Sequence, residues 1–352
     1  MEKEYETCLS CPRGCGINRN NKHIGTCGET ADLRIAWAGL HFGEEPPVTG
    51  ERGSGTIFIT GCNLGCVFCQ NFQISRDGMG RKVEAAEFAE ICLSLSEAGA
   101  ENINIVTGSH AIPSIASGLR KAKDQGLSIP ILWNSSAYEK TEELSLLEGL
   151  VTVWLPDLKT LNPLLSENVF RASDYPKIAK KAIRFMAEKS PLIIEQSLQV
   201  TAGDQKARRA HSDNSAHNAG DNEANQGKIV SGVIVRHLAL PGRLPDTELV
   251  LRWFAEHLKD KALLSLMTQY TPVKKSPYAQ GIDAFPDRLI DQNEYKKLTR
   301  LLEELEIDTG FYQELVEDAD WLPDFARQQP FPSKLAKPVW HWSTGFLLNS
   351  GK

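Results

Sequence analysis

Three cysteines, Cys62, Cys66 and Cys69, follow one another closely in the segment GCNLGCVFCQN. Three thiolates on one glycine-containing loop can hold three corners of a cubane iron–sulfur cluster. No fourth cysteine is near them in the sequence, so one iron would keep a coordination position for a substrate ligand, as catalytic metal sites do. The alternative interpretation is a structural zinc ion that takes its fourth ligand from elsewhere in the chain.

Four of the other five cysteines precede this loop, as Cys8, Cys11, Cys15 and Cys27. Four thiolates suffice for a closed zinc site, and a metal would fold a lead that contains few core residues. Four thiolates would equally complete a second iron–sulfur cluster that relays electrons to the first. The sequence leaves both possibilities open. The last cysteine, Cys92, falls on the apolar stripe of a predicted helix and is expected to be a core residue.

The elements that must position the cysteine loop form a regular series of short apolar runs and helical patterns. The runs are rich in Ile, Val and Leu, as buried parallel strands are, and comprise residues 56–60, 102–106, 129–133, 151–155, 232–240 and 262–266. Six strands alternating with helices predict an α/β fold, either an open parallel sheet or a partial barrel. In both architectures the active site lies at the carboxyl ends of the strands, and only Gly61 separates the first strand from Cys62.

Composition limits the class of protein. The 352 residues are 41% hydrophobic with a net charge of −6, which excludes a wholly disordered chain and argues against a nucleic-acid or anionic-membrane binder. No run approaches the roughly 18 apolar residues of a membrane span, and the start MEKEYETC lacks a signal region, so we expect a cytoplasmic protein. We expect a Cys-rich N-terminal extension (1–55), a barrel (56–305) with a disordered insertion (201–227), and an irregular C-terminal arm (306–352).

Longer stretches carry a family likeness. The cysteine triplet, with Phe68 before its last member, matches the signature of radical S-adenosylmethionine (SAM) enzymes. Together with CLSCPRGCGINR near the start, five segments resemble an uncharacterised radical SAM group related to pyruvate formate-lyase activating enzymes. They are HFGEEPPVTGERGSGTIFITGCNLGCVFCQN (41–71), NINIVTGSH (102–110), VTVWLPDLK (151–159), VRHLALPG (235–242) and LMTQY (266–270).

The resemblance implies a partial (βα)6 barrel and an oxidoreductase chemistry. Cys62, Cys66 and Cys69 would hold a [4Fe–4S] cluster whose open iron binds the amino and carboxylate groups of SAM. An electron from a donor such as flavodoxin or ferredoxin would then cleave SAM to methionine and a 5′-deoxyadenosyl radical. The related enzymes use this radical to take a hydrogen atom from a glycine of a glycyl-radical enzyme, which would be the partner here. The cluster would supply the chemistry and the protein the positioning.

The resemblance also assigns SAM contacts at the first strand ends. Phe68 lies within the signature, and Thr107 and Ser109 end the second predicted strand. Related enzymes carry a Gly-Gly-Glu motif at this second strand end, which binds the SAM amino group. The acidic residue is missing here, so Ser109 or His110 would replace it.

Further contacts are implied at the next strand ends. Asn134 and Ser135 end the third predicted strand, where a ribose or methionine-carboxylate contact is expected. Asp157 and Lys159 match an Asp-x-Lys motif, whose Asp in activating enzymes helps to hold a monovalent cation near the SAM carboxylate. The fifth strand would direct a charge toward SAM or substrate from Arg236 and His237.

Other interpretations remain. The same radical chemistry could act on a peptide, a cofactor precursor or a small metabolite, and a non-catalytic metal-binding protein is a more distant alternative. The segment HFGEEPP holds His41, Glu44 and Glu45, and a close Glu pair before two prolines is more often a solvated turn than a catalytic pair.

Overall fold

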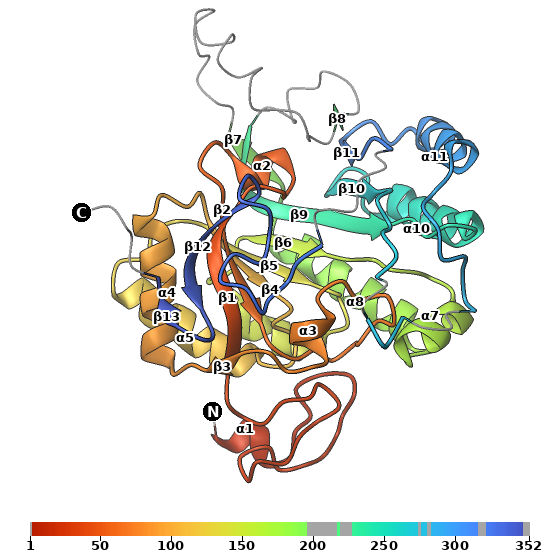
Figure 1. The fold of residues 1–352 in the computed structure, drawn as a ribbon. Helices are drawn as coiled ribbons and strands as arrows, with labels where there is room; N and C mark the ends of the chain where they lie inside the picture. Colours follow the sequence, from red (N-terminus) through yellow and green to blue (C-terminus); the bar gives the residue numbers. More distant parts are fainter. Residues whose placement is uncertain are drawn as a thin grey trace, which may run out of the picture.

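The computed structural model describes residues 2–195, 217–218, 227–273, 276–279, 283–315 and 322–347. Its centre is a sheet in the order β13-β12-β1-β2-β4-β5-β6-β9-β10-β11-β8 (Figure 1). The consecutive parallel strands of this order are β2 (Ser54–Ile59), β4 (Ile103–Val106), β5 (Ile131–Ser135), β6 (Val153–Pro156), β9 (Lys228–Leu238) and β10 (Leu263–Met267). Each of them overlaps one of the predicted strands. The expected α/β class with a mainly parallel sheet is therefore confirmed.

Antiparallel strands extend the parallel sheet at one end. β1 (Arg34–His41) pairs with β2, and β12 (Ala336–His341) pairs with β1 and with β13 (Gly345–Phe346). At the other end, β11 (Gly310–Tyr312) runs parallel to β10 and pairs with β8 (His217–Asn218). Two short strands, β3 (Arg81–Lys82) and β7 (Ile193–Glu195), pair with β1 and β9.

These strands cross the boundaries that the sequence suggested for the segments of the chain. The boundary at residue 55 falls inside the sheet, because β1 belongs to the segment expected to be a separate extension. The segment 306–352, expected to be irregular, contributes β11, β12 and β13. β12 covers the edge that β1 would otherwise leave unpaired, a long-range pairing that local patterns do not reveal. Apart from residues 217, 218 and 227, the predicted disordered insertion (201–227) lies outside the described residues.

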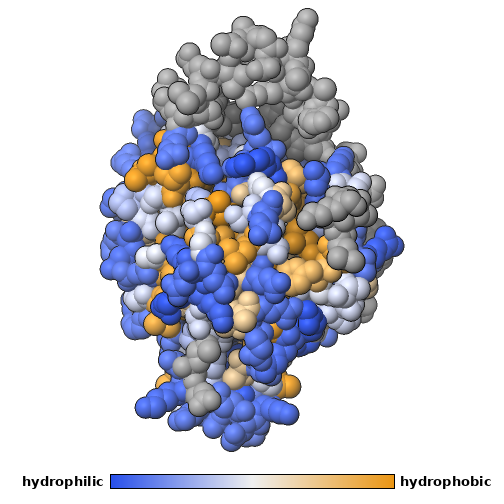
Figure 2. All heavy atoms as spheres, turned by 90° about the vertical axis from the view of Figure 1, so that its left-hand side faces the viewer, coloured by the Kyte–Doolittle hydropathy of each residue, from blue (hydrophilic) through white to orange (hydrophobic). Residues whose placement is uncertain are grey.

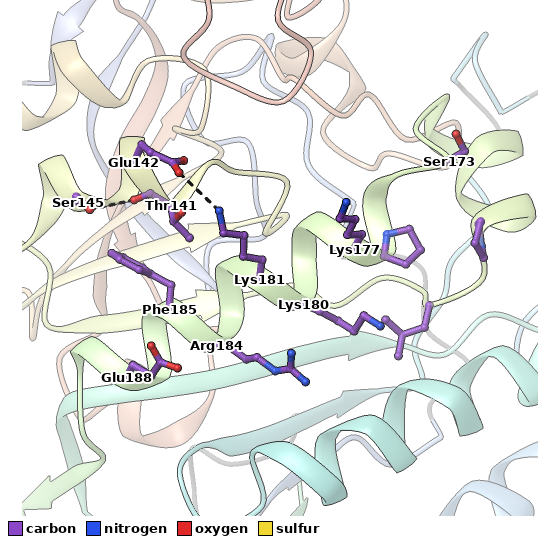
Figure 3. Close-up of a pocket in the computed structure, with 13 residues that line it drawn as sticks. Thr141, Glu142, Ser145, Ser173, Lys177, Lys180, Lys181, Arg184, Phe185 and Glu188 are labelled. Atoms are coloured by element: carbon purple, nitrogen blue, oxygen red, sulfur yellow. Dashed lines mark hydrogen bonds and ion pairs between the residues drawn. The ribbon is translucent and has the colours of Figure 1, made fainter.

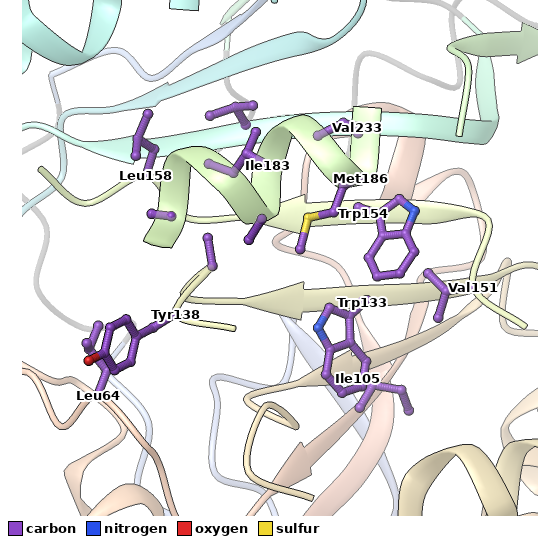
Figure 4. Close-up of a cluster of buried hydrophobic side chains, with 14 of the residues drawn as sticks. Leu64, Ile105, Trp133, Tyr138, Val151, Trp154, Leu158, Ile183, Met186 and Val233 are labelled. Atoms are coloured by element: carbon purple, nitrogen blue, oxygen red, sulfur yellow. The ribbon is translucent and has the colours of Figure 1, made fainter. Parts of the chain in front are cut away.

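Helices pack against the sheet, and both of its faces are apolar. Along β4, Ile105 joins the cluster beneath the helices, whereas its neighbour Val106 joins a cluster on the other face. Figure 4 shows Trp133 and Trp154 beneath Met186 and Ile183 of α8, all of them nearly inaccessible. The helices are α1 (Glu2–Glu6), α2 (Pro46–Thr49), α3 (Phe72–Ser75), α4 (Ala85–Glu97), α5 (Ile112–Asp124), α6 (Thr141–Leu144), α7 (Pro163–Phe170), α8 (Tyr175–Lys189), α10 (Leu244–His257) and α11 (Gln292–Glu304), with a 3₁₀ turn η1 (Ser145–Leu147).

The lead, which we define as residues 2–33, contains one short helix, α1, and lies at one end of the sheet (Figure 1). In Figure 2 the lead forms the narrow lower part of the molecule, and hydrophilic side chains cover most of its visible surface. Hydrophobic side chains gather nearer the middle of that face. Among the described helices, none combines the length and the apolar content that a membrane span requires.

Candidate active site

A cavity of about 680 Å³ lies at the carboxyl ends of the parallel strands. It collects side chains from the loop after β2 and from the ends of β4, β5, β6, β9 and β10. The predicted site residues that line it are Cys62, Cys66, Phe68, Cys69, Thr107, Asn134, Ser135, Asp157, Lys159 and Arg236. The structure therefore brings together in one place residues that are spread over about half of the sequence.

The cysteine loop is held on several sides by backbone and side-chain hydrogen bonds. The N–H of Cys62 donates to the carbonyl of Cys27 at 3.0 Å, and the N–H of Val67 donates to the carbonyl of Val169 at 3.1 Å. The side chain of Asn63 donates to the carbonyl of Tyr138 at 2.7 Å. The loop is thus fixed to the lead, to α7 and to the segment after β5, which pre-organises its three thiols.

The three thiols share one electrostatic neighbourhood. Burial raises the pKa of Cys66 and of Cys69, and in both cases the nearby thiols of the loop raise it further. The positive charge of Lys159 partly offsets this effect at Cys66, whose pKa nevertheless stays above its ordinary value. The buried thiols of Cys66 and Cys69 therefore stay protonated until a metal replaces the proton, so cluster binding by these two residues would release protons.

Thr107 ends β4 with a backbone angle that its residue type rarely adopts. Its φ is +66°, which is a strained value for a β-branched side chain. Its N–H donates to the carbonyl of Asn134 at 2.9 Å, so the strained turn is tied to the end of β5. Strain of this kind costs about 1–3 kcal/mol and tends to occur at functional sites. Both residues line the cavity.

Asp157 and Lys159 form an ion pair on the cavity wall. The Lys159 Nζ lies 2.6 Å from Asp157 Oδ2. Burial would lower the pKa of Lys159, but Asp157 and Cys66 outweigh burial and hold it above its ordinary value. Tyr175, which the sequence did not single out, donates its hydroxyl to the Asp157 carbonyl at 2.7 Å and accepts from the Lys159 N–H at 2.9 Å. Lys159 is therefore a charged group held in place beside the cysteine loop.

The Glu pair of HFGEEPP is buried, and the expectation of a solvated turn is wrong. Glu44 and Glu45 have side chains that are only 9% and 8% exposed, and both contact the guanidinium of Arg236 in β9. Burial would raise the pKa of Glu45, but Arg236 outweighs it and the pKa is lowered. His41 Nδ1 lies 3.6 Å from Glu44 Oε1. The buried cation lies 191 residues from Glu45 in sequence, so local composition could not reveal the cluster.

Two predicted contact residues do not line the cavity. Ser109 is buried and donates to Glu139 Oε1 at 2.7 Å, while His237 contacts the Leu158 carbonyl at 2.7 Å and Thr247 Oγ1 at 3.0 Å. His110, offered as a substitute for the missing acid, is also buried and outside the cavity lining, and burial lowers its pKa to about 3. Ser109 and His237 are hydrogen-bonded to other residues and His110 is buried, so none of these three side chains contributes to the cavity lining.

Glu139 is a residue that the sequence did not single out. Its carboxylate is buried and accepts hydrogen bonds from Ser109 Oγ, Trp133 Nε1 and Ser135 Oγ at 2.7, 2.7 and 2.8 Å. These donors come from the ends of β4 and β5, so one side chain joins two strand ends beside the cavity. Burial raises the pKa of Glu139.

Phe68 lines the cavity with one part of its ring and packs on other aromatic side chains with the rest. It lies edge-on to Phe285 at 5.6 Å, to Phe170 at 6.1 Å and to Tyr270 at 6.3 Å between ring centroids. Aromatic pairs of this kind contribute about 0.5–1.5 kcal/mol each. The position of Phe68 in the signature is thus explained at least by packing that anchors the cysteine loop.

The four cysteines of the lead also influence one another. Burial raises the pKa of Cys11, and Cys8 and Cys15 raise it further. Burial likewise raises the pKa of Cys27, to about 11, and Cys11 adds to this effect. Cys92 is fully buried in α4, as expected of a core residue.

Neither set of cysteines has the arrangement of a single-ion site. Within the described residues, no three or more His, Cys, Asp or Glu side chains are placed as ligands of one metal ion. The zinc ion and the monovalent cation that the sequence suggested therefore have no support in this part of the chain. A cubane cluster is a different case, because it bonds each thiolate to a separate iron atom, so its ligands stand farther apart than those of one ion.

A second pocket lies on the outer helical layer, and no cysteine lines it. It has a volume of about 930 Å³ and lies between α8 and the segments around α6 and α7. Figure 3 shows Lys177, Lys180, Lys181 and Arg184 along α8, with Glu142 paired to Lys181 at 3.6 Å. None of its lining residues lies at the carboxyl end of a parallel strand, so we do not assign the chemistry to it.

The cysteine loop lies in a segment that matches a known protein family. Residues 56–192 match the model of the Radical SAM superfamily, and this range starts in β2 and contains the loop. Residues 56–192 form a radical SAM domain. An uncharacterized protein of Methanocaldococcus jannaschii is 27% identical over 312 residues, which are 86% of this chain and 76% of that protein.

Solved structures similar to this chain have low sequence identity. The SAM-bound SuiB of Streptococcus suis is 12% identical with a TM-score of 0.47, covering 72% of this chain and 48% of SuiB, so the chain spans about half the length of that protein. A domain of the pyruvate-formate lyase-activating enzyme of Bacteroides vulgatus is 11% identical with a TM-score of 0.34, covering 58% and 91%. A radical SAM methyltransferase of Sphaerobacter thermophilus is 14% identical with a TM-score of 0.46, covering 74% and 66%.

A radical SAM domain implies a [4Fe–4S] cluster and SAM, and the residues present fit both. Cys62, Cys66 and Cys69 supply soft thiolate ligands from one loop and all three line the same cavity. The cavity lies within the usual size of small-molecule sites, about 300–1,000 Å³, and its polar side chains converge from several strand ends. Among these, Lys159 offers a fixed positive charge beside the cysteine loop.

Proposed function

We propose that this protein is a radical SAM enzyme that reductively cleaves SAM and uses the resulting 5′-deoxyadenosyl radical to abstract a hydrogen atom. The observation that carries the proposal is the single cavity in which Cys62, Cys66 and Cys69 meet the carboxyl ends of the parallel strands. When bound, the cluster would supply the electron for cleavage and the open iron for the SAM amino and carboxylate groups.

The chain's own residues position the reactants and limit the access of water. The ion pair of Asp157 and Lys159 offers a fixed ammonium group to a carboxylate in the cavity. The strained turn at Thr107 and the neighbouring Asn134 offer polar groups at the ends of β4 and β5. Phe331 and Leu335, from the segment before β12, also line the cavity and add apolar surface to it.

The test of the radical chemistry is anaerobic. The protein would be reconstituted with iron and sulfide, mixed with dithionite and SAM, and assayed for 5′-deoxyadenosine by chromatography. We expect product from the wild type and none above background from Cys66→Ala. The matched control is Cys92→Ala, which removes a buried thiol outside both cysteine sets and keeps the activity. No product from wild-type protein with an intact cluster would disprove the proposal.

For the substrate, we propose a glycine backbone Cα of a partner protein, that is, activation of a glycyl-radical enzyme. The support is the likeness of the segments around residues 41–71, 151–159 and 235–242 to the activating-enzyme group. The test is to incubate the reduced protein and SAM with a glycyl-radical enzyme and to record electron paramagnetic resonance spectra. A doublet from a glycine-centred radical would support activation. SAM cleavage without a glycyl radical on any such enzyme tested would favour a peptide or small-molecule substrate instead.

A further inference from the structure

Backbone hydrogen bonds hold the loops of the lead together, and three of its four cysteines are buried. The N–H of Cys8 donates to the carbonyl of Ile17 at 2.8 Å, and the N–H of Gly16 donates to the carbonyl of Cys8 at 3.0 Å. A Cβ atom at Gly25 would lie 3.3 Å from the sulfur of Cys27 and 3.7 Å from that of Cys15, so both sulfurs border one small space. Cys8, Cys11 and Cys27 are buried, and Cys15 is partly exposed.

A buried guanidinium faces this set of thiols. Arg19 is only 2% exposed; it donates to the carbonyl of His110 at 2.8 Å and lies 3.7 Å from the sulfur of Cys8. Its other contacts are the carbonyl of Thr30 and the ring of Tyr5, 4.5 Å from its centroid. Among the ion pairs of the described residues, none includes Arg19; the buried carboxylate of Glu29 interacts electrostatically with Arg19 but is paired with Arg34 at 3.2 Å. A buried cation needs a nearby negative charge, and a metal centre of four thiolates would supply one.

The same lead contacts the cysteine loop of the radical SAM domain directly. The Cys27 carbonyl accepts from the Cys62 N–H at 3.0 Å, so one residue of each cysteine set takes part in one hydrogen bond. Arg13 donates to the carbonyls of Asn63 at 2.8 Å and Leu64 at 3.2 Å in the same loop. The two cysteine sets are therefore neighbours in space as well as in sequence.

The outer side of the lead is suited to contact with another protein. Leu9, next to Cys8, is 51% exposed, and Ile24, three residues before Cys27, is 64% exposed. Among the described residues six large apolar side chains are exposed, and two of them, Leu9 and Ile24, belong to the lead, which also carries the partly exposed Cys15. By contrast, Cys66 is buried, at 8% exposure, and lines the cavity at the strand ends.

We propose that Cys8, Cys11, Cys15 and Cys27 bind a second, redox-active iron–sulfur cluster through which electrons enter the radical SAM domain. A reduced low-potential one-electron carrier of the flavodoxin or ferredoxin class gives one electron to this cluster and is itself oxidised. The second cluster then passes that electron to the cluster on Cys62, Cys66 and Cys69 and returns to its oxidised state. The existence of the site is independent of the proposed function, whereas the relay step rests on it.

The iron and sulfide content of the reconstituted full-length protein tests whether the second cluster exists. After anaerobic reconstitution, the wild type should contain about eight iron and eight sulfide atoms per chain, as two [4Fe–4S] clusters require. A triple variant, Cys62→Ala, Cys66→Ala and Cys69→Ala, should keep about four of each. Cys92→Ala is the control and should match the wild type. A triple variant that holds zinc instead of iron, or no metal, would overturn the proposal.

Two further measurements test the relay. Cys15→Ser with Cys27→Ser should lower the ratio of flavodoxin-driven to dithionite-driven 5′-deoxyadenosine formation at least tenfold, because small dithionite can bypass the lead. An unchanged ratio would overturn the relay. Arg19→Met should shift the midpoint potential of the second cluster to a more negative value, with Arg19→Lys retaining most of the wild-type potential; equal potentials in all three proteins would contradict the assigned contact.

The outcomes separate this proposal from the proposed function. If the triple variant keeps four irons but the wild type forms no 5′-deoxyadenosine, the second cluster stands and the radical chemistry fails. If the wild type is active with only four irons, all lost in the triple variant, the radical chemistry stands and the second cluster fails.

Discussion

The backbone N–H of Cys62 lies 3.0 Å from the carbonyl oxygen of Cys27, and this hydrogen bond joins the cysteine loop to the lead. The contact is possible because Gly61, the residue directly before Cys62, has a φ of +86° and no side chain. A Cβ atom there would lie 2.9 Å from the Cys27 carbonyl oxygen, 2.4 Å from Glu29 Cγ and 3.1 Å from His110 Nε2. The loop and the lead therefore approach each other too closely for any side chain at this position.

Gly61→Ala is expected to separate the lead from the cysteine loop. A left-handed backbone costs an alanine about 1–2 kcal/mol, and overlap with the fixed Cys27 carbonyl adds to this cost. Gly126→Ala is the control, because Gly126 has a φ of +103° but nothing within 4 Å of its Cβ position. In denaturant unfolding, Gly61→Ala should lose about 2 kcal/mol more than Gly126→Ala. Equal losses would mean that the close approach does not matter.

Periodicity and composition predicted most of what is local. The parallel strands were predicted because each is a short apolar run, and both of their faces are indeed buried. The position of Cys62 directly after the first strand placed the cysteine loop at the carboxyl edge of the sheet. The site followed from one general property, that parallel strands end at a common edge.

What the sequence did not reveal depends on partners that are distant in the chain. Glu45 resembles a solvated turn residue until Arg236 is placed beside it by β9. Ser109 lies three residues after the end of β4, where its hydroxyl donates to the buried Glu139 and takes no part in the cavity lining. β12 pairs with β1 from the far end of the chain, and no local periodicity records such pairing.

Glu139→Ala is expected to destabilise the strand ends beside the cavity. It leaves the buried hydroxyls of Ser109 and Ser135 and the indole N–H of Trp133 without their acceptor, and each unsatisfied donor costs about 1–3 kcal/mol. We expect a loss of about 3–5 kcal/mol of unfolding free energy for Ala. Gln keeps an acceptor and the shape of the side chain, so Glu139→Gln should lose less than half as much. Similar losses for both variants would show that the hydrogen bonds are not the cause.

Lys159→Met is expected to weaken SAM binding to the cluster-loaded protein. The substitution leaves Asp157 as an unpaired negative charge on the cavity wall, which repels a bound carboxylate. We expect the Kd for SAM to rise at least tenfold, which corresponds to about 1.4 kcal/mol, measured by anaerobic titration calorimetry. Lys261→Met, at an exposed position, is the control and should leave Kd unchanged. An unchanged Kd for Lys159→Met would remove Lys159 from the binding site.

Glu101 lies just before β4, and its ion pairs are expected to make the unfolding free energy depend on pH. Its carboxylate lies 2.9 Å from Arg52 Nε and 3.1 Å from Lys228 Nζ, and the hydrogen bond from Arg52 is the main cause that lowers its pKa to about 2, from 4.5. A folded-state pKa below the unfolded value means that the stabilisation is complete above about pH 4.5 and is lost as the pH falls toward 2.

The comparison of wild type with Glu101→Gln isolates this contribution. Since Arg52 is 62% exposed, the expected difference in unfolding free energy at pH 7 is only about 1 kcal/mol. That difference should shrink at pH 3, because the wild-type carboxyl is then protonated in the unfolded chain but still ionised in the folded one. Glu90→Gln, at an exposed position outside the described ion pairs, should show no such change. A difference that stays constant from pH 7 to pH 3 would show that Glu101 titrates normally and that its two ion pairs do not stabilise the start of β4.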